Sequence, residues 1–353
     1  QVLEDVGILS EAFDAVEELA PWKELGRGPN RGVGIAACMW LTNPMPGSAT
    51  LKLNSDGTLG VLTAATENGS GAIATGVRQI AAQELGLPVH KIFITMPDTD
   101  AAAFDAGSQG SRTTHIVGRA VREAAVGVRA QIFETAANIL EAAPEDLELA
   151  NEVIRVSGSP STQVSLAEVA ATAQANSGPI TGTGSYTTPL PPINPTCASG
   201  LLFPAFPTPT YHVHVAEVEI DPITGVVHVL RYLVAQEVGT AINPQAVRGQ
   251  IQGGVVQGLG YALWETLRIE AGRYSQRTLE AYGLPLAVDI PEVEIALLEH
   301  PDPAGPYGAK GVAEPPIIPV AAAIGNAVED ALGKSVNTLP ITPEHVLQAL
   351  RGS

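Results

Sequence analysis

The sequence predicts an α+β protein with two subdomains, each a mixed sheet packed against helices. Two stretches alternate apolar and polar residues and reverse at a turn, which is typical of β-hairpins. The first runs from Ala49 to Ala64 around the turn 54–57, and the second runs from Tyr211 to Val234 around the turn 221–225. Helices lie between them without a regular βαβ alternation, which favours α+β over α/β.

The other elements follow from apolar spacing and turn residues. Apolar residues three and four apart predict helices near residues 8–20, 71–85, 113–142, 165–175, 243–265 and 317–332, and short apolar runs predict strands at 33–40, 91–96 and 147–156. Ser165 and Glu168 form the pattern of a capping box. Because residues 175–202 are rich in Gly, Ser, Thr and Pro, we expect subdomains at residues 1–180 and 181–353.

Composition and charge restrict the classes of function. The 353 residues, 45% of them hydrophobic, are enough for two domains with disulfide-free cores. A net charge of −18 argues against nucleic acid and anionic membranes as partners. No apolar run approaches the ~18 residues of a membrane span. The start, Gln1–Asp5, has neither an initiator Met nor a signal sequence. We therefore expect a cytoplasmic location and a chain that belongs to something longer.

Cysteine and histidine give no sign of a metal centre. The two cysteines, Cys38 and Cys197, are too few for an iron–sulfur cluster, which typically takes four thiolates. His212 and His214 would share one face of a strand, where a packed or solvated pair is more common than a metal pair. We therefore expect no metal ligand among the side chains.

Two glycine-rich loops each precede a predicted helix. Residues 67–71, Glu-Asn-Gly-Ser-Gly, would offer backbone N–H groups to an anionic oxygen or a phosphate, although a tight turn explains the glycines equally well. Residues 107–114 combine glycines and hydroxyls with Arg112, which suggests an anion cradle. A capped helix start with a surface arginine is the alternative.

A third glycine-rich segment, residues 249–260, lies within a predicted helix. Its repeated glycines suit close helix packing and ligand binding equally. Gln257 is the polar side chain that we expect to matter there, because a buried amide needs hydrogen-bond partners.

The segment Gly308–Pro316 places one carboxylate, Glu314, after small residues and at the start of a helix. Pro315 and Pro316 fit a first helical turn, where a missing N–H costs nothing. The simplest reading is a carboxylate favoured by the helix dipole. The alternative is a functional group directed at the space that the glycines leave open.

Taken together, these motifs resemble the molybdopterin-binding subunit of the molybdenum hydroxylases, the family of xanthine dehydrogenase, aldehyde oxidase and aerobic carbon monoxide dehydrogenase. Residues 66–71 are similar to that family's Thr-Glu-Met-Gly-Gln-Gly loop, 107–114 to its Gly-Ser-x-Gly-Ser-Arg segment, 237–244 to its Asp-x-Gly-x-x-Ile-Asn-Pro turn, 253–260 to its Val-Gln-Gly helix and 308–316 to its C-terminal glutamate motif. The resemblance covers essentially the whole chain and implies the second half of the molybdopterin cofactor-binding domain.

The resemblance implies roles for individual residues. Glu314 would be the catalytic base in the hydroxylation of a heterocycle, an aldehyde or a related small molecule, with water as the oxygen source. The second subdomain would carry this glutamate. The residues implied to bind the cofactor are Asn68, Gly69, Ser70, Gly71, Gly110, Ser111, Arg112, Thr113, Gln257, Lys310, Gly311 and Val312.

The implied cofactor is molybdopterin with molybdenum, in its cytosine dinucleotide form. FAD and iron–sulfur clusters would reside on partner subunits only. Since the family's N-terminal half has no counterpart here, the chain would need that half, or a large molybdopterin subunit, together with an iron–sulfur subunit and an FAD subunit. A hetero-oligomer is expected.

Two positions depart from the family pattern. Ser70 stands where the family has glutamine, and Glu237 stands where it has aspartate. The shorter Ser70 allows a second interpretation, in which the chain is a non-catalytic assembly or cofactor-holding module of the same fold. The retained carboxylate of Glu314 favours the enzyme.

Overall fold

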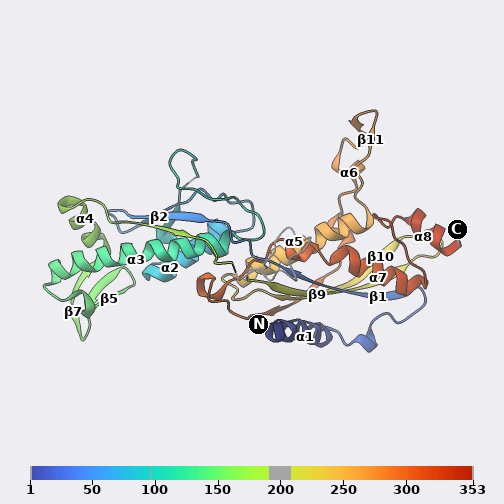
Figure 1. Ribbon diagram of the computed structural model, residues 1–353, viewed down its shortest axis with the longest axis horizontal. Coiled ribbons are helices and arrows are strands. Elements are labelled where there is room, and N and C mark those ends of the chain that lie inside the picture. Colours follow the sequence, from blue (N-terminus) through green and yellow to red (C-terminus); the bar gives the residue numbers. More distant parts are fainter. Residues whose placement is uncertain (1, 96, 191–207, 352–353) are drawn as a thin grey trace.

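Two mixed sheets, each covered by helices, form two bodies that lie end to end in an elongated molecule (Figure 1). The computed structural model describes residues 2–95, 97–190 and 208–351. Helices and mixed sheets make up both bodies, which confirms the predicted α+β class. None of the described helices is long and apolar enough to span a bilayer. Cys197 and part of the predicted connection between the halves lie outside the described residues.

The first body is built on a four-stranded sheet in the order β4-β3-β2-β8. Its elements are β2 (Gly47–Leu53), β3 (Leu59–Leu62), η2 (Ala72–Val77, a π-helix), α2 (Arg78–Leu85), η3 (Val89–Lys91), β4 (Ile92–Ile94), α3 (Thr113–Leu140), η4 (Pro144–Asp146), β5 (Leu147–Ala150), β6 (Val153–Val156), β7 (Ser159–Ser165), α4 (Leu166–Asn176) and β8 (Thr181–Tyr186). The long helix α3 lies across β8 and β2. Gly184 permits this packing, because a Cβ there would lie 2.1 Å from the Ala120 carbonyl oxygen.

The second body is built on the sheet β1-β9-β10-β13, with helices on both faces. Its elements are α1 (Val2–Leu19), η1 (Trp22–Glu24), β1 (Arg31–Trp40), β9 (Thr210–Ile220), β10 (Val227–Glu237), α5 (Pro244–Leu263), β11 (Ile269–Glu270), β12 (Arg273–Tyr274), α6 (Leu279–Tyr282), η5 (Ala287–Asp289), β13 (Val293–Leu298), η6 (Pro306–Gly308), η7 (Pro315–Ile317), α7 (Val320–Leu332) and α8 (Pro343–Arg351). Helices α5 and α7 pack on one face of the sheet, and α1 packs on the other.

Both predicted hairpins and the predicted cap are present. Strand β2 pairs with β3, and β9 pairs with β10, both antiparallel. The Ser165 hydroxyl accepts a hydrogen bond from the Glu168 backbone N–H at 3.1 Å and caps α4, which is the first of the two bonds of the predicted capping box. The division at residue 180 stays a prediction, and strand pairing crosses it, because β1 pairs with β9 and β8 pairs with β2.

Three buried histidines carry imidazole rings whose pKa is lowered by burial. His212 and His214 lie on β9, and His115 lies on α3. Burial lowers the pKa of His212 to about 3, against a smaller opposing contribution from the Gln236 side chain. It also lowers the pKa of His115, and the pKa of His214 well below its ordinary value. All three rings are therefore neutral in the folded protein at neutral pH.

Stability should consequently fall as the pH drops below about 6.5. The unfolded chain takes up protons on these rings from 6.5 downward, whereas the folded chain takes them up only below the lowered folded pKa of each ring. His212 and His214 should thus each cost about 1.4 kcal/mol per pH unit in this interval, and His115 adds to the loss. Urea unfolding at pH 7.5, 6.5 and 5.5 measures the slope, which His212→Gln should reduce by about 1.4 kcal/mol per pH unit. Equal free energies of unfolding at pH 7.5 and 5.5 would contradict this prediction.

Candidate functional site

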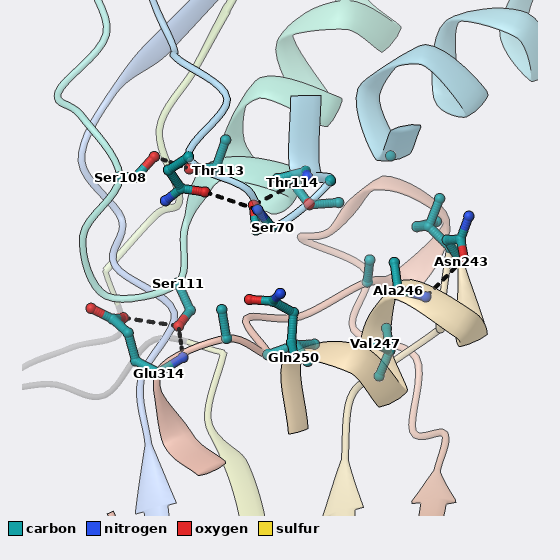
Figure 2. Close-up of a pocket in the computed structure, with 18 of the residues that line it drawn as sticks. Ser70, Ser108, Ser111, Thr113, Thr114, Asn243, Ala246, Val247, Gln250 and Glu314 are labelled. Atoms are coloured by element: carbon teal, nitrogen blue, oxygen red, sulfur yellow. Dashed lines mark hydrogen bonds between the residues drawn. The ribbon is translucent and has the colours of Figure 1, made fainter. Parts of the chain in front are cut away.

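Four segments far apart in the sequence surround one cavity of about 400 Å³ where the two bodies meet (Figure 2). They are the loop before η2, the loop before α3, the start of α5 and the loop before η7. The lining residues are Asn68, Gly69, Ser70, Gly71, Ala72, Gly76, Ser108, Gln109, Ser111, Thr113, Thr114, Thr240, Ile242, Asn243, Ala246, Val247, Gln250, Ala309, Lys310, Val312, Ala313 and Glu314. The glycine-rich loops therefore do share one site.

The loop before η2 is shaped by an internal carboxylate. Glu67 accepts hydrogen bonds from the backbone N–H groups of Gly69, Gly71, Ile73 and Ala74, at 2.9 to 3.1 Å. Partial burial raises the pKa of Glu67, but these four bonds outweigh burial and lower the pKa below its ordinary value. The expectation that this loop keeps free N–H groups for an anion is therefore wrong, since its own glutamate occupies them.

With its N–H groups occupied, the first loop offers side chains to the cavity. Asn68 and Ser70 line it, and each also stabilises the turn: Asn68 Oδ1 accepts from the Ser70 N–H, and Ser70 Oγ accepts from the Ala72 N–H. A π-helix follows at once, a rare form that is frequent at functional sites.

Ser111 and Glu314 bind one another across the seam between the bodies. The Ser111 hydroxyl donates to Glu314 Oε2 at 2.8 Å and accepts from the Glu314 backbone N–H at 3.0 Å (Figure 2). Ser111 holds a φ of 55°, a strained value for a residue other than glycine, directly after Gly110 at 58°. The carboxylate of Glu314 is thereby fixed at the cavity while the residue stays exposed to solvent.

Arg112 is placed differently from the sequence interpretation. Its guanidinium is fully buried, forms an ion pair with Asp105 at 2.9 Å, and donates to the carbonyl oxygens of Met45, Pro46 and Gly107. Arg112 is not among the lining residues. The Arg112 side chain stabilises the loop that carries Ser111, so the anion-cradle interpretation of the guanidinium is wrong. Only the backbone of Arg112 remains for a ligand.

The loop that carries Glu314 is hydrogen-bonded to both bodies. From the first body, His115 Nδ1 bonds the Ala309 carbonyl at 2.9 Å, and because a carbonyl only accepts, Nδ1 carries the hydrogen. From the second, Thr42 Oγ1 accepts from the Gly311 N–H, and Gln236 donates to the Val312 carbonyl. These bonds hold the loop before any ligand binds.

Lys310 lines the cavity, but its ammonium belongs to a buried ion pair. Its Nζ lies 3.0 Å from Glu237 Oε2 and donates to the Pro209 carbonyl. Burial raises the pKa of Glu237 above its ordinary value, while Lys310 and the Gly239 N–H oppose that rise. Glu237, the residue that departs from the family's aspartate, thus anchors this loop.

Helix α5 supplies the fourth wall with a different glutamine from the one expected. Asn243 caps the helix by accepting the Ala246 N–H at 3.0 Å, and Gln250 reaches the cavity. Gln257 is exposed two turns further along the helix and is not among the lining residues. Gln257 therefore lies outside this cavity, and its implied role in holding the cofactor stays a prediction.

Two glycines of α5, Gly254 and Gly258, allow close packing of the helix. A Cβ at Gly254 would lie 2.6 Å from Pro316 Cβ, and one at Gly258 would lie 2.5 Å from Val320 Cβ. Because neither glycine has a Cβ atom, α5 can touch η7, the turn directly after Glu314. The structure therefore supports close packing at Gly254 and Gly258, while Gln250 at the start of the same segment lines the cavity.

Most of the implied cofactor residues converge on the cavity, and several unanticipated ones join them. Asn68, Gly69, Ser70, Gly71, Ser111, Thr113, Lys310, Val312 and Glu314 line it, whereas Gly110, Arg112, Gln257 and Gly311 do not. Other lining residues belong to the motifs at 107–114, 237–244 and 249–260 without having been given a cofactor role, namely Ser108, Gln109, Thr114, Thr240, Ile242, Asn243 and Gln250, and Ala246 and Val247 lie outside those motifs. The sequence alone could have predicted a role for Asn243, since an Asn-Pro pair before an apolar helix is typical of a helix cap.

The electrostatics of the cavity favour an anionic, hydrogen-bonding ligand. Among the described residues that line it, Glu314 is the sole carboxylate, although the chain has 37 acidic residues. The N-terminal ends of α3 and α5 open onto it, and helix N-termini attract negative charge. Within the described part of the chain, no group of three or more His, Cys, Asp or Glu residues could hold a metal ion.

Comparison with known proteins agrees with this geometry. Residues 9–291 match the family described as molybdopterin cofactor-binding domain. The xanthine dehydrogenase molybdenum-binding subunit of Escherichia coli O157:H7 is 33% identical over 90% of this chain and 42% of its own length. The nicotine 6-hydroxylase large subunit of Paenarthrobacter nicotinovorans is 32% identical over 99% of this chain and 45% of its own.

Solved structures share the fold as well. Quinoline 2-oxidoreductase from Pseudomonas putida 86 superposes with a TM-score of 0.82 at 28% identity, covering 97% of this chain and 46% of that one. The chain belongs to the molybdopterin cofactor-binding domain family, and it is similar to part of a xanthine dehydrogenase molybdenum-binding subunit. It spans less than half the length of these relatives.

The lining fits such a cofactor. Amide side chains of Asn68, Gln109, Asn243 and Gln250 lie at the cavity, where a pterin needs polar partners. The amide of Asn243 is already bonded to Ala246 and Gln79 within the protein. The near absence of carboxylates and the two helix N-termini suit its phosphate. Because the protein offers no metal ligands of its own here, molybdenum would be held by the cofactor.

Gly254→Ala should destabilise the protein, whereas Gly253→Ala should not. The added methyl at Gly254 meets Pro316, which overpacks the contact below Glu314 and costs about 1–3 kcal/mol. At Gly253 the same methyl meets nothing within 4 Å, and the better helix propensity of alanine should gain up to about 1 kcal/mol. Urea unfolding of both variants measures the difference. Equal free energies of unfolding would disprove the close contact.

Proposed function

We propose that this chain is the cofactor-holding and base-bearing part of a molybdenum hydroxylase that hydroxylates a heterocycle, an aldehyde or a related small molecule. The observation that carries the proposal is Glu314, the one carboxylate among the described lining residues, held by Ser111 on a loop bonded to both bodies. When bound, the molybdenum cofactor supplies the two-electron oxidation and a water-derived oxygen.

The residues of this chain then have defined tasks. The amides and hydroxyls of the lining orient the cofactor, and in our proposal its dinucleotide is the cytosine form. Glu314 accepts a proton at Oε1, because Oε2 already accepts the Ser111 hydroxyl. A base held in one rotamer spares the orientation cost of proton transfer. Ser70 keeps an oxygen at the cavity, but a shorter one than the family's glutamine offers.

The exposure of Glu314 supports a need for further polypeptide. A base of this kind works best where water is excluded, yet Glu314, Asn68 and Gly69 are all exposed. We propose that the part of the relatives that this chain leaves unmatched, on the same or another polypeptide, covers this side. Iron–sulfur and FAD subunits would then carry the electrons in a hetero-oligomeric, cytoplasmic complex.

Glu314→Gln should abolish turnover without loss of cofactor. Glutamine keeps the shape and the oxygen that accepts the Ser111 hydroxyl, but it cannot take a proton, so turnover should fall by at least about 100-fold. Molybdenum and released nucleotide, measured in the natively purified complex, should equal those of the wild type. The matched control is Glu329→Gln, an exposed position on α7, which should keep full turnover.

Two outcomes would overturn the proposal. Wild-type turnover in Glu314→Gln would remove its catalytic role. A wild-type complex without molybdenum or nucleotide would favour the non-catalytic module instead.

A further inference from the structure

A projecting segment of this chain, residues 266–289, is apolar and uncovered. These residues, which we name the arm, include β11, β12, α6 and η5 and rise away from the body beyond the end of α5 (Figure 1). Large apolar side chains in it are 48% to 88% exposed, namely Leu267, Ile269, Tyr274, Leu279, Leu284, Leu286 and Val288. Such a concentration in one short segment marks an interaction surface.

The arm has no core of its own. Strands β11 and β12 have two residues each, all exposed, and no residue of α6 or η5 is buried. An isolated two-stranded hairpin is marginally stable at best in water. Its backbone is nevertheless well formed: Thr278 caps α6 through the Ala281 N–H at 3.1 Å, and Thr266 bonds Tyr282 across the base. A formed but coreless arm suits docking against another surface.

The charge of the arm differs from that of the rest of the chain. Three arginines balance three acidic residues within it, namely Arg268, Arg273 and Arg277 against Glu270, Glu280 and Asp289, so the whole net charge of −18 lies elsewhere. Association of two copies would bring two such acidic bodies together, which their repulsion opposes. Polypeptide outside these 353 residues, on the same or another chain, has no such constraint, so we commit to that occupant.

The relatives indicate which polypeptide this is. The chain matches 42–46% of the length of the xanthine dehydrogenase, nicotine hydroxylase and quinoline oxidoreductase chains, so more than half of each has no counterpart in it. We propose that the arm is the docking surface for that remaining portion of the molybdenum subunit. The proposal rests on the proposed function and names the surface through which the site is completed.

The position of the arm suits this role. The arm follows α5, whose first turns line the cavity. About 20 Å of helix separates Gln250 from the end of α5, where the arm begins. The loop between β4 and α3, which carries Phe104 at 66% exposure, leaves the molecule on the same side as the arm (Figure 1). A polypeptide that spans from the arm to this loop would pass over the seam between the two bodies (Figure 1).

Co-expression tests the proposal. The tagged chain is produced with the polypeptide of the same organism that matches the remaining portion of the relatives, and the affinity of the pair is measured. Leu279→Asp and Val288→Asp should each weaken it by at least about 10-fold. Ile223→Asp is the matched control, because Ile223 is 86% exposed in the β9–β10 turn, and it should bind like the wild type. Urea midpoints should not change, since all three side chains are exposed.

Each other outcome overturns the docking role. Arm variants that bind as tightly as the wild type would exclude this surface, and a wild-type chain that does not bind the polypeptide would exclude this occupant. Self-association that the arm variants abolish would assign the surface to a second copy instead. None of these binding measurements uses turnover or molybdenum content, so their outcomes are independent of the test of Glu314.

Discussion

The paired hydrogen bonds between Ser111 and Glu314 are the constraint on which the site depends. Ser111 lies on the loop that enters the first body, and Glu314 lies on the loop that enters α7 of the second. Ser111 keeps its strained φ because the buried ion pair between Arg112 and Asp105 fixes the loop that carries it. Both bodies must therefore fold and meet before the carboxylate has its orientation.

The same seam explains how an acidic protein can hold an anionic cofactor. Two acidic residues near the cavity have their carboxylates bonded within the protein. Glu67 accepts backbone N–H groups, and Glu237 forms an ion pair with Lys310. The helix starts of α3 and α5 then dominate the local field. Net charge is a property of the whole surface, whereas binding depends on the few groups at the site.

Local patterns predicted much of this protein, and long-range pairing accounts for what they missed. The hairpins, α3 and the Ser165 cap follow from spacing over a few residues. Gln250 and Gln257 show the limit: seven residues of α-helix return to nearly the same face about 10 Å further along, so helical periodicity cannot choose between them. Only the contact of α5 with η7 at Gly254 decides which glutamine reaches the cavity.

Glu314 is exposed, yet hydrogen bonds fix both its side chain and its loop. A surface glutamate without a role has no reason to be fixed by a strained serine on a loop that His115, Thr42 and Gln236 also restrain. Ordering such a loop costs conformational entropy, about 1–2 kcal/mol per residue, which these hydrogen bonds offset. The chain thus holds this carboxylate in place on an open wall, as expected of a site that a second surface completes.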